Sequence, residues 1–110
     1  MKVHLIKKQT IIEYSFANAQ SRIPLSAWVL KLSYSDWETP LDIKDTFNTA
    51  DLLGNGTDRV VFNIGGNNYR IICKYYFGEK EAHLFIYWIG THKQYDVLCN
   101  NNEQYTIKNY

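Results

Sequence analysis

The short stretch THKQYD at 91–96 carries four side chains that can exchange protons or hold charge. These are His92, Lys93, Tyr95 and Asp96, and they follow directly on an apolar run. An imidazole has an ordinary pKa of about 6.5, so it can take or give a proton near neutral pH. Lys93 can stabilise negative charge that develops on a phosphate. The residue types therefore indicate acid–base chemistry on a charged substrate.

Each of these residues also has a plainer interpretation. Asp96 can orient an imidazole, or it can cap a helix that begins near Gln94. Tyr95 can donate a hydrogen bond or act as an acid. For His92 alone a surface or capping position is the simpler reading, and for Asp96 this holds even more strongly.

Two cations lie upstream in residues 69–77, which predict a strand. Side chains alternate across a strand, so Arg70 and Lys74 share one face. A separation of four residues at ~3.3 Å each puts them roughly 13 Å apart, which suits contacts with successive phosphates. We expect this face to be open, and a merely solvated face is the alternative. The opposite, more apolar set is expected under helices: Tyr69, Ile71, Cys73, Tyr75 and Phe77.

The first half of the chain is expected to be helical after a short strand at 3–6. Thr10 and Glu13 fit a capping box that opens a helix over about residues 10–20. Its apolar residues at helical spacing are Ile12, Phe16 and Ala19. A second helix begins near Pro24 and ends before residue 39, because the residue that precedes a proline avoids helical geometry. Its apolar stripe comprises Leu25, Trp28, Val29 and Leu32.

The second half predicts an antiparallel meander. The expected strands are 60–64, 69–77 and 82–89, joined by tight loops at 65–68 and 78–81. Residues 40–58 are expected to be irregular, and the segment 104–108 is expected to be either an extra strand or a disordered arm. Helices first and hairpins afterwards predict an α+β fold with two N-terminal helices packed on a small, mostly antiparallel sheet.

Composition limits the classes of protein. The chain has 110 residues, which predicts a single domain over 1–110 with a flexible or strand-forming tail at 100–110. Its formal net charge is +1, so binding of a nucleic acid would depend on a local patch. We find no pattern of a signal peptide and no apolar run of roughly 20 residues that would span a membrane. Cys73 and Cys99 form no CxxC motif, so we expect no metal site, reduced thiols and a cytoplasmic protein.

Two segments carry a resemblance to a known family. The stretches RVVFNIGGNNYR at 59–70 and WIGTHKQYD at 88–96 resemble the HigB toxin family, whose members are mRNA interferases of the RelE-like superfamily. The resemblance covers about residues 41–98, and Lys44 and Phe47 fit its lead-in. The pairing of VFNIGGNxYR with THKxYD at this separation is specific, whereas the helical first forty residues carry no diagnostic motif.

The resemblance implies a toxin that cleaves mRNA on the translating ribosome without a metal or other cofactor. It implies catalytic or RNA-contacting roles for Arg70, His92, Lys93 and Tyr95. The expected general base is His92, followed by Tyr95. Asn63 and Lys44 belong to the same pattern and are expected to bind RNA, whereas Lys74 is expected to do so only from its place on the strand.

The resemblance also implies a partner and leaves two alternatives. The partner is a HigA-like helix-turn-helix antitoxin, and we expect outward-facing side chains such as Tyr14 and Trp37 to contact it. One alternative is a non-catalytic module that binds RNA or the ribosome through its aromatic residues. The other is a toxin of the same fold that acts on gyrase. The near-neutral charge and the Asn-rich tail depart from the family pattern.

Overall fold

The computed structural model describes residues 1–110 and contains a five-stranded mixed sheet at its centre. In spatial order the strands are β1 (Lys2–Ile6), β5 (Glu81–Thr91), β4 (Tyr69–Phe77), β3 (Arg59–Ile64) and β2 (Asp51–Leu52). The expected meander β3–β4–β5 is confirmed, and the short strand β2 was not expected. Strand β1 pairs in parallel with β5, because the helices that follow β1 carry the chain across one face before it returns. The α+β prediction is therefore confirmed.

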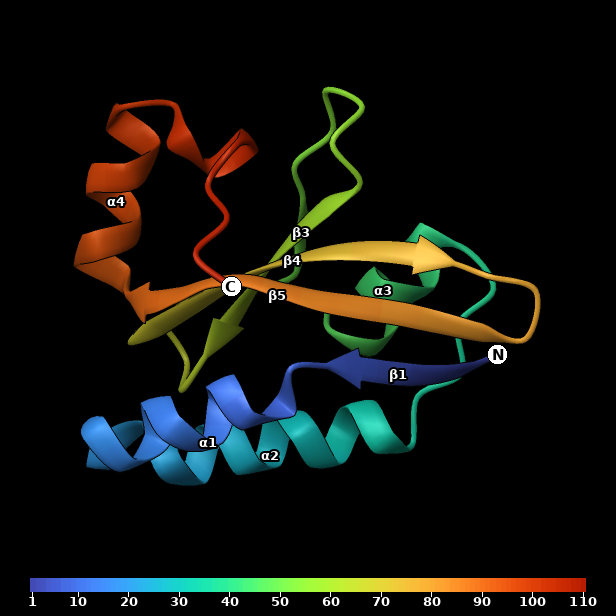
Figure 1. Ribbon diagram of the computed structural model, residues 1–110, viewed down its shortest axis with the longest axis horizontal. Helices are drawn as coiled ribbons and strands as arrows, with labels where there is room; N and C mark the ends of the chain where they lie inside the picture. The colour runs from blue at the N-terminus through green and yellow to red at the C-terminus, as the bar shows by residue number, and fades with distance from the viewer.

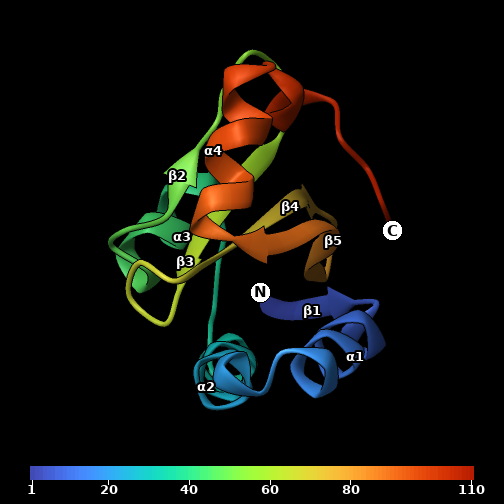
Figure 2. The same ribbon diagram turned by 90° about the vertical axis from the view of Figure 1, so that its left-hand side faces the viewer.

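Helices α1 (Lys8–Ala17) and α2 (Arg22–Ser33) lie side by side on one face of the sheet, joined by the 3₁₀ turn η1 (Ala19–Ser21) (Figures 1 and 2). The apolar stripe of α2 is confirmed, since Leu25, Trp28 and Leu32 are buried. They join a core of 17 buried residues that includes Ile71 and Cys73 of β4. The expected helix-facing side of β4 is thus correct.

The expected start of the first helix is wrong. Helix α1 begins at Lys8 and has no capping box, because Lys7 adopts a left-handed conformation (φ 67°) that turns the chain directly out of β1. This start rotates the helix so that Ile11 is buried. Ile12 and Phe16, which were expected to share one apolar face of this helix, are 38% and 72% exposed.

Residues 40–58 are more regular than expected. Helix α3 (Pro40–Thr46) begins with Pro40 at its first position and with a capping box between Thr39 and Asp42. The sequence TPLD contains this signal, which the sequence analysis overlooked. Trp37, just before it, was expected to face outward. It is only 1% exposed, and its indole donates a hydrogen bond to Thr46 Oγ1 at 2.9 Å.

The second sheet face is partly covered, which corrects the expectation of an open face. Helix α4 (His92–Asn100) and the 3₁₀ turn η2 (Glu103–Tyr105) rise from this face (Figure 2). A small cluster of Val61, Ile72, Trp88 and Leu98 lies beneath them. Strand β5 contains one extra residue at Tyr87, where its register with β4 shifts.

The C-terminal segment is neither a strand nor a detached arm. It returns along β5, where the backbone N–H of Asn109 donates to the carbonyl of Tyr87 at 2.8 Å. The guanidinium of Arg59 donates to the carbonyls of Gln104 and Ile107, at 3.1 and 2.6 Å. These bonds tie the segment to the first residue of β3. None of the helices is both long and apolar enough to cross a membrane.

Candidate active site

The THKQYD stretch folds into the last residue of β5 and the first turns of α4. Thr91 is the N-cap: its side chain accepts a hydrogen bond from the Gln94 N–H at 3.2 Å, and the Gln94 side chain accepts one from the Thr91 N–H at 2.9 Å. The helix therefore begins at His92 and not near Gln94, and Asp96 is not its cap. Residues three or four apart share one side of a helix, so this start places His92, Tyr95 and Asp96 as neighbours.

The imidazole of His92 faces a carboxylate. Its Nε2 lies 3.6 Å from Oδ2 of Asp96, longer than a hydrogen bond but within the range of an ion pair. The other ring nitrogen, Nδ1, is buried and has no hydrogen-bond partner. Asp96 thus lies where it can orient the imidazole, and His92 is partly exposed and able to exchange a proton with a substrate.

Arg70 lies on the neighbouring strand and is almost wholly buried. Its exposed fraction is 7%, and its guanidinium donates hydrogen bonds to the Tyr69 carbonyl and to Oδ1 of Asn67. None of the ion pairs of the structure involves Arg70. A buried cation without a carboxylate retains its positive charge for an anionic ligand, because low dielectric strengthens that attraction.

A single turn connects Arg70 with His92. In the β4–β5 pairing Arg70 lies opposite Gly90, two residues before His92. The β3–β4 turn then holds both residues, because the Asn67 side chain accepts from Arg70 and the Asn68 carbonyl accepts from the His92 N–H at 3.0 Å. The structure thus brings the two residues to the same end of the sheet. Neither residue lines any of the five cavities of the structure.

Tyr95 is half-buried against the sheet, with its ring 6.2 Å from that of Trp88. Burial raises the pKa of its phenol well above the ordinary value, the neighbouring Cys99 raises it further, and the positive charge of Arg70 acts in the opposite direction. Tyr95 therefore keeps its proton at neutral pH. This argues against Tyr95 as the general base.

The remaining candidate residues divide into near and remote ones. Asn63 pairs directly with Arg70 across β3 and β4, and Lys93 is exposed in the first turn of α4. Lys74 lies opposite Arg59 on β3, farther along β4 than Ile72 of the small cluster beneath α4. Lys44 is exposed in the last turn of α3. Neither Lys74 nor Lys44 forms a hydrogen bond or ion pair with Arg70, His92, Lys93 or Tyr95.

Asn67 and Asn68 were missed by the sequence analysis, which saw them only as turn residues. Gln94 was also missed as part of a cap, although the spacing T-x-x-Q carries that signal. The structure groups no three or more His, Cys, Asp or Glu side chains that could hold a metal ion.

Comparison with known proteins gives one family match and several similar proteins. A family model described as HigB_toxin, RelE-like toxic component of a toxin-antitoxin system, matches residues 21–98. Similar proteins include the "mRNA interferase toxin HigB" of Escherichia coli (strain K12) and the "mRNA interferase HigB" of Shigella flexneri. Each is 26% identical over 96 residues, covering 87% of this chain and 90% of the relative. The family match spans more than half of the chain and includes α2 and the two stretches 59–70 and 88–96. This chain therefore belongs to the HigB toxin family of RelE-like toxic components of toxin–antitoxin systems.

Proposed function

We propose that this protein is a toxin that inhibits translation by cleaving mRNA. The observation that carries the proposal is the junction at the Asn67–Asn68 turn, which holds the buried cation Arg70 and the start of the helix that bears His92. The relatives named above as mRNA interferases support the same reaction. We place the reaction in the cytoplasm, on mRNA engaged by the ribosome.

The proposed reaction is attack of a ribose 2′-OH on the adjacent phosphate. His92, oriented by Asp96, takes the proton from the 2′-OH while the new O2′–P bond forms. Arg70 and Lys93 stabilise the charge on the phosphoryl oxygens, and the protonated phenol of Tyr95 donates a hydrogen bond to one of them. The P–O5′ bond then breaks and the leaving oxygen takes a proton from water. The products are a 2′,3′-cyclic phosphate and a 5′-OH end.

The test uses His92→Ala and Arg70→Lys in cells that express the protein. Acid–base groups of this kind contribute about 10²–10⁴-fold to rate, so we expect His92→Ala to restore growth and to abolish new RNA 5′ ends on translating ribosomes. Arg70→Lys keeps a charge but loses the fork-shaped donor set, so we expect reduced cleavage. Arg22→Ala, an exposed arginine of α2, is the matched control and should remain toxic.

Circular dichroism of the purified variants checks that they remain folded. Folded His92→Ala and Arg70→Lys proteins that are as toxic as the parent would disprove the assigned site. Ribosome binding without new RNA ends would instead support a non-catalytic module.

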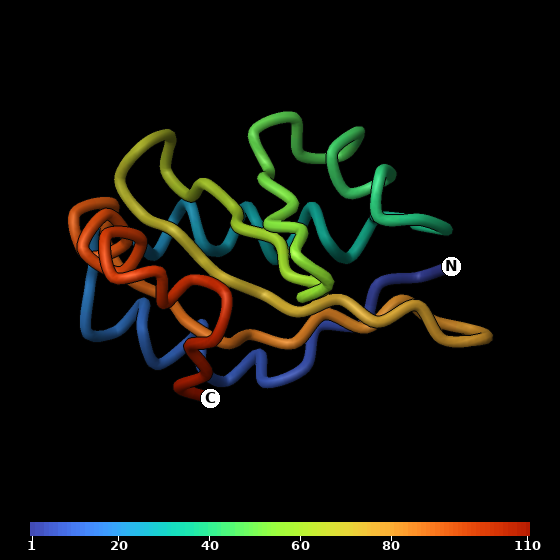
Figure 3. The backbone as a smooth tube through the Cα atoms, turned by 90° about the horizontal axis from the view of Figure 1, so that it is seen from above, coloured from blue at the N-terminus to red at the C-terminus, as the bar shows by residue number.

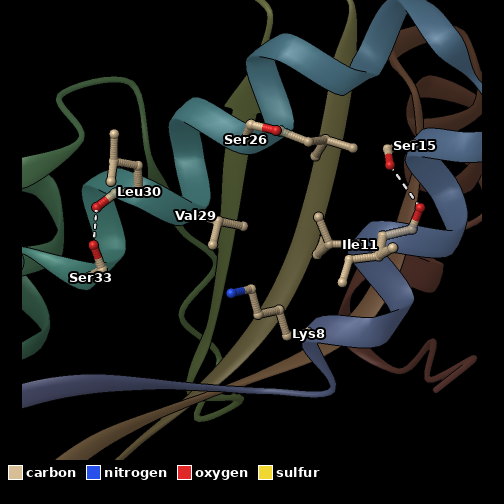
Figure 4. Close-up of a pocket in the computed structure, with 9 residues that line it drawn as sticks. Lys8, Ile11, Ser15, Ser26, Val29, Leu30 and Ser33 are labelled. Carbon is tan, nitrogen blue, oxygen red and sulfur yellow. Dashed lines mark hydrogen bonds between the residues drawn. The ribbon is translucent and has the colours of Figure 1, made fainter.

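We also propose that the antitoxin is a HigA-like helix-turn-helix protein, and that part of it covers a groove between α1 and α2. The groove encloses about 360 Å³ and is lined by apolar residues that include Ile11, Val29 and Leu30 (Figure 4). The hydroxyls of Ser15 and Ser33 at its rim donate to carbonyls of their own helices, so they do not need a partner. Lys8 extends between the helices without a carboxylate partner. An apolar segment with one acidic residue fits this groove, and family membership supplies the occupant.

A further inference from the structure

The second sheet face has a region that α4 and the C-terminal segment leave uncovered. Figure 3 shows these elements over one end of the sheet, while the hairpin between β4 and β5 extends beyond them. Tyr76, near the end of β4, is 60% exposed there. The proposed cleavage reaction gives this region no role.

Aromatic rings line this uncovered region in a row. The ring of Tyr76 is stacked on that of His83 at 6.1 Å with an interplanar angle of 25°. The ring of His83 in turn lies 6.5 Å from that of Phe85. Tyr76 and His83 are direct partners in the β4–β5 pairing, so the strands fix the row and hold its exposed end in place. A flat, pre-positioned ring is the kind of surface on which an unpaired base stacks.

The same face is basic, although the chain as a whole is nearly neutral. Strand pairing places four cations on it, namely Lys2, Arg59, Arg70 and Lys74, together with two carboxylates, Asp51 and Glu81. Since the formal net charge of the chain is +1, the rest of the molecule carries a net negative charge. The positive charge is therefore concentrated on one face, as a polyanion requires.

Lys74 joins the row to the candidate active site. It lies on the same face of β4 as Arg70 and Tyr76, and opposite Phe85 on β5. Arg70 and Tyr76 are six residues apart, or roughly 20 Å at ~3.3 Å per residue. That length is in keeping with the site sizes of about 4–16 nucleotides found in small domains that bind single strands.

We propose that Tyr76, supported by His83 and Phe85, is a stacking subsite for single-stranded RNA, and that Lys74 contacts the phosphate backbone between it and the cleavage site. The inference rests on the proposed function for the nature of the ligand. Bases stack on the ring of Tyr76 without sequence preference, because every base has a flat face. The subsite thereby holds RNA outside the cleaved dinucleotide.

The test measures binding of fully 2′-O-methylated RNA oligonucleotides, which lack the attacking 2′-OH and cannot be cleaved. Fluorescence anisotropy compares a 12-mer with a 4-mer. We expect Tyr76→Ala to weaken binding of the 12-mer by about 5- to 150-fold and to leave the 4-mer nearly unchanged. Tyr76→Phe should bind like the parent, because the ring is retained. Tyr34→Ala removes an aromatic side chain that is 83% exposed at the end of α2, and it should have no effect.

Lys74→Gln gives a second, independent measurement. Loss of one phosphate contact should lower the slope of log affinity against log salt by about 0.7. A parent protein that does not bind the 12-mer, or a Tyr76→Ala variant that binds it as tightly as the parent, overturns the subsite. So does a Tyr76→Ala variant that binds RNA normally but loses the antitoxin, because the row would then be a protein interface.

These outcomes are separate from failure of the proposed function. A protein that binds the 12-mer through Tyr76 but produces no RNA ends retains the subsite and loses the nuclease. A protein that cleaves mRNA with no dependence on Tyr76 retains the nuclease and loses the subsite.

Discussion

The environment of Tyr95 shows how burial changes the protonation of one residue. Its phenol has the same chemistry in the sequence as any of the other eight tyrosines. The structure places it half-buried beside Trp88 and within electrostatic reach of Arg70, and burial raises its pKa. A phenol that keeps its proton is a hydrogen-bond donor and a poor base. The choice left open between His92 and Tyr95 thus favours His92.

Tyr95→Phe tests this role. The substitution retains the ring and removes the donor, so we expect kcat for mRNA cleavage to fall by about 10²–10³-fold with the neutral limb of the pH–rate profile unchanged. In the folded protein the raised pKa stabilises the protonated form. The resulting contribution to the free energy of unfolding is fully present below the unfolded-state pKa of about 10. It is lost as the pH rises through the higher folded-state pKa.

The stability of the parent should therefore fall more steeply above about pH 10 than that of Tyr95→Phe, as measured by urea unfolding. A variant with the same alkaline dependence as the parent would show that the phenol is not buried as described. A shift of the neutral limb of the pH–rate profile would reinstate Tyr95 as the base.

At the level of secondary structure, helix α4 positions the side chains of the THKQYD stretch. Its capping box fixes the first turn, and the Asn68 carbonyl fixes the backbone of His92 against the β3–β4 turn. Burial of Leu98 in the small cluster fixes the other end of the helix on the sheet. The position of the His92 imidazole therefore depends on α4, on the sheet beneath it and on the β3–β4 turn.

Thr91→Ala removes the N-cap of α4 without substituting any candidate catalytic residue. Loss of a threonine N-cap costs about 0.5–2 kcal/mol, so we expect the free energy of unfolding to fall by about 1 kcal/mol in urea denaturation. We also expect cleavage to weaken, because the first turn that carries His92 frays. Thr49→Ala, at an exposed loop threonine, should change stability by less than about 0.5 kcal/mol. Equal stabilities of the two variants would show that the cap does not fix α4.

At the scale of the whole molecule, the two faces of the sheet have different properties. One face lies under α1 and α2 and forms the main core, and the outer surface of those helices bears the apolar groove. The other face is basic and carries the candidate active site and the aromatic row. This separation allows an antitoxin to bind the helices while RNA binds the sheet.

Leu30→Glu tests the groove. Leu30 is 58% exposed, so a charge there should leave folding and toxicity unchanged but weaken antitoxin binding by at least about tenfold in calorimetry. Cells that co-express the antitoxin should then stop growing. Tyr34→Glu, at the residue that directly follows this helix and outside the groove, is the matched control. Unchanged binding of Leu30→Glu would show that the antitoxin binds elsewhere.

Elements whose signals are local can be predicted from the chain alone. Alternation predicted the three long strands and the helix-facing side of β4, the spacing of Leu25, Trp28 and Leu32 predicted the inner face of α2, and two motifs predicted the family. Local capping signals for α3 and α4 were also present in TPLD and THKQ and were overlooked. These features depend on residues within a few positions of one another, and so they can be read from a single chain.

Other features depend on contacts between distant segments, and they emerge only when the chain is folded. Arg59 is buried by carbonyls more than forty residues away, Trp37 is covered by α3, and the β3–β4 turn joins Arg70 to His92. The phase of α1 follows from a left-handed residue at the end of β1, which periodicity alone did not reveal. Burial and electrostatic environment are properties of the packed molecule. They distinguish reactive side chains that look alike in the sequence.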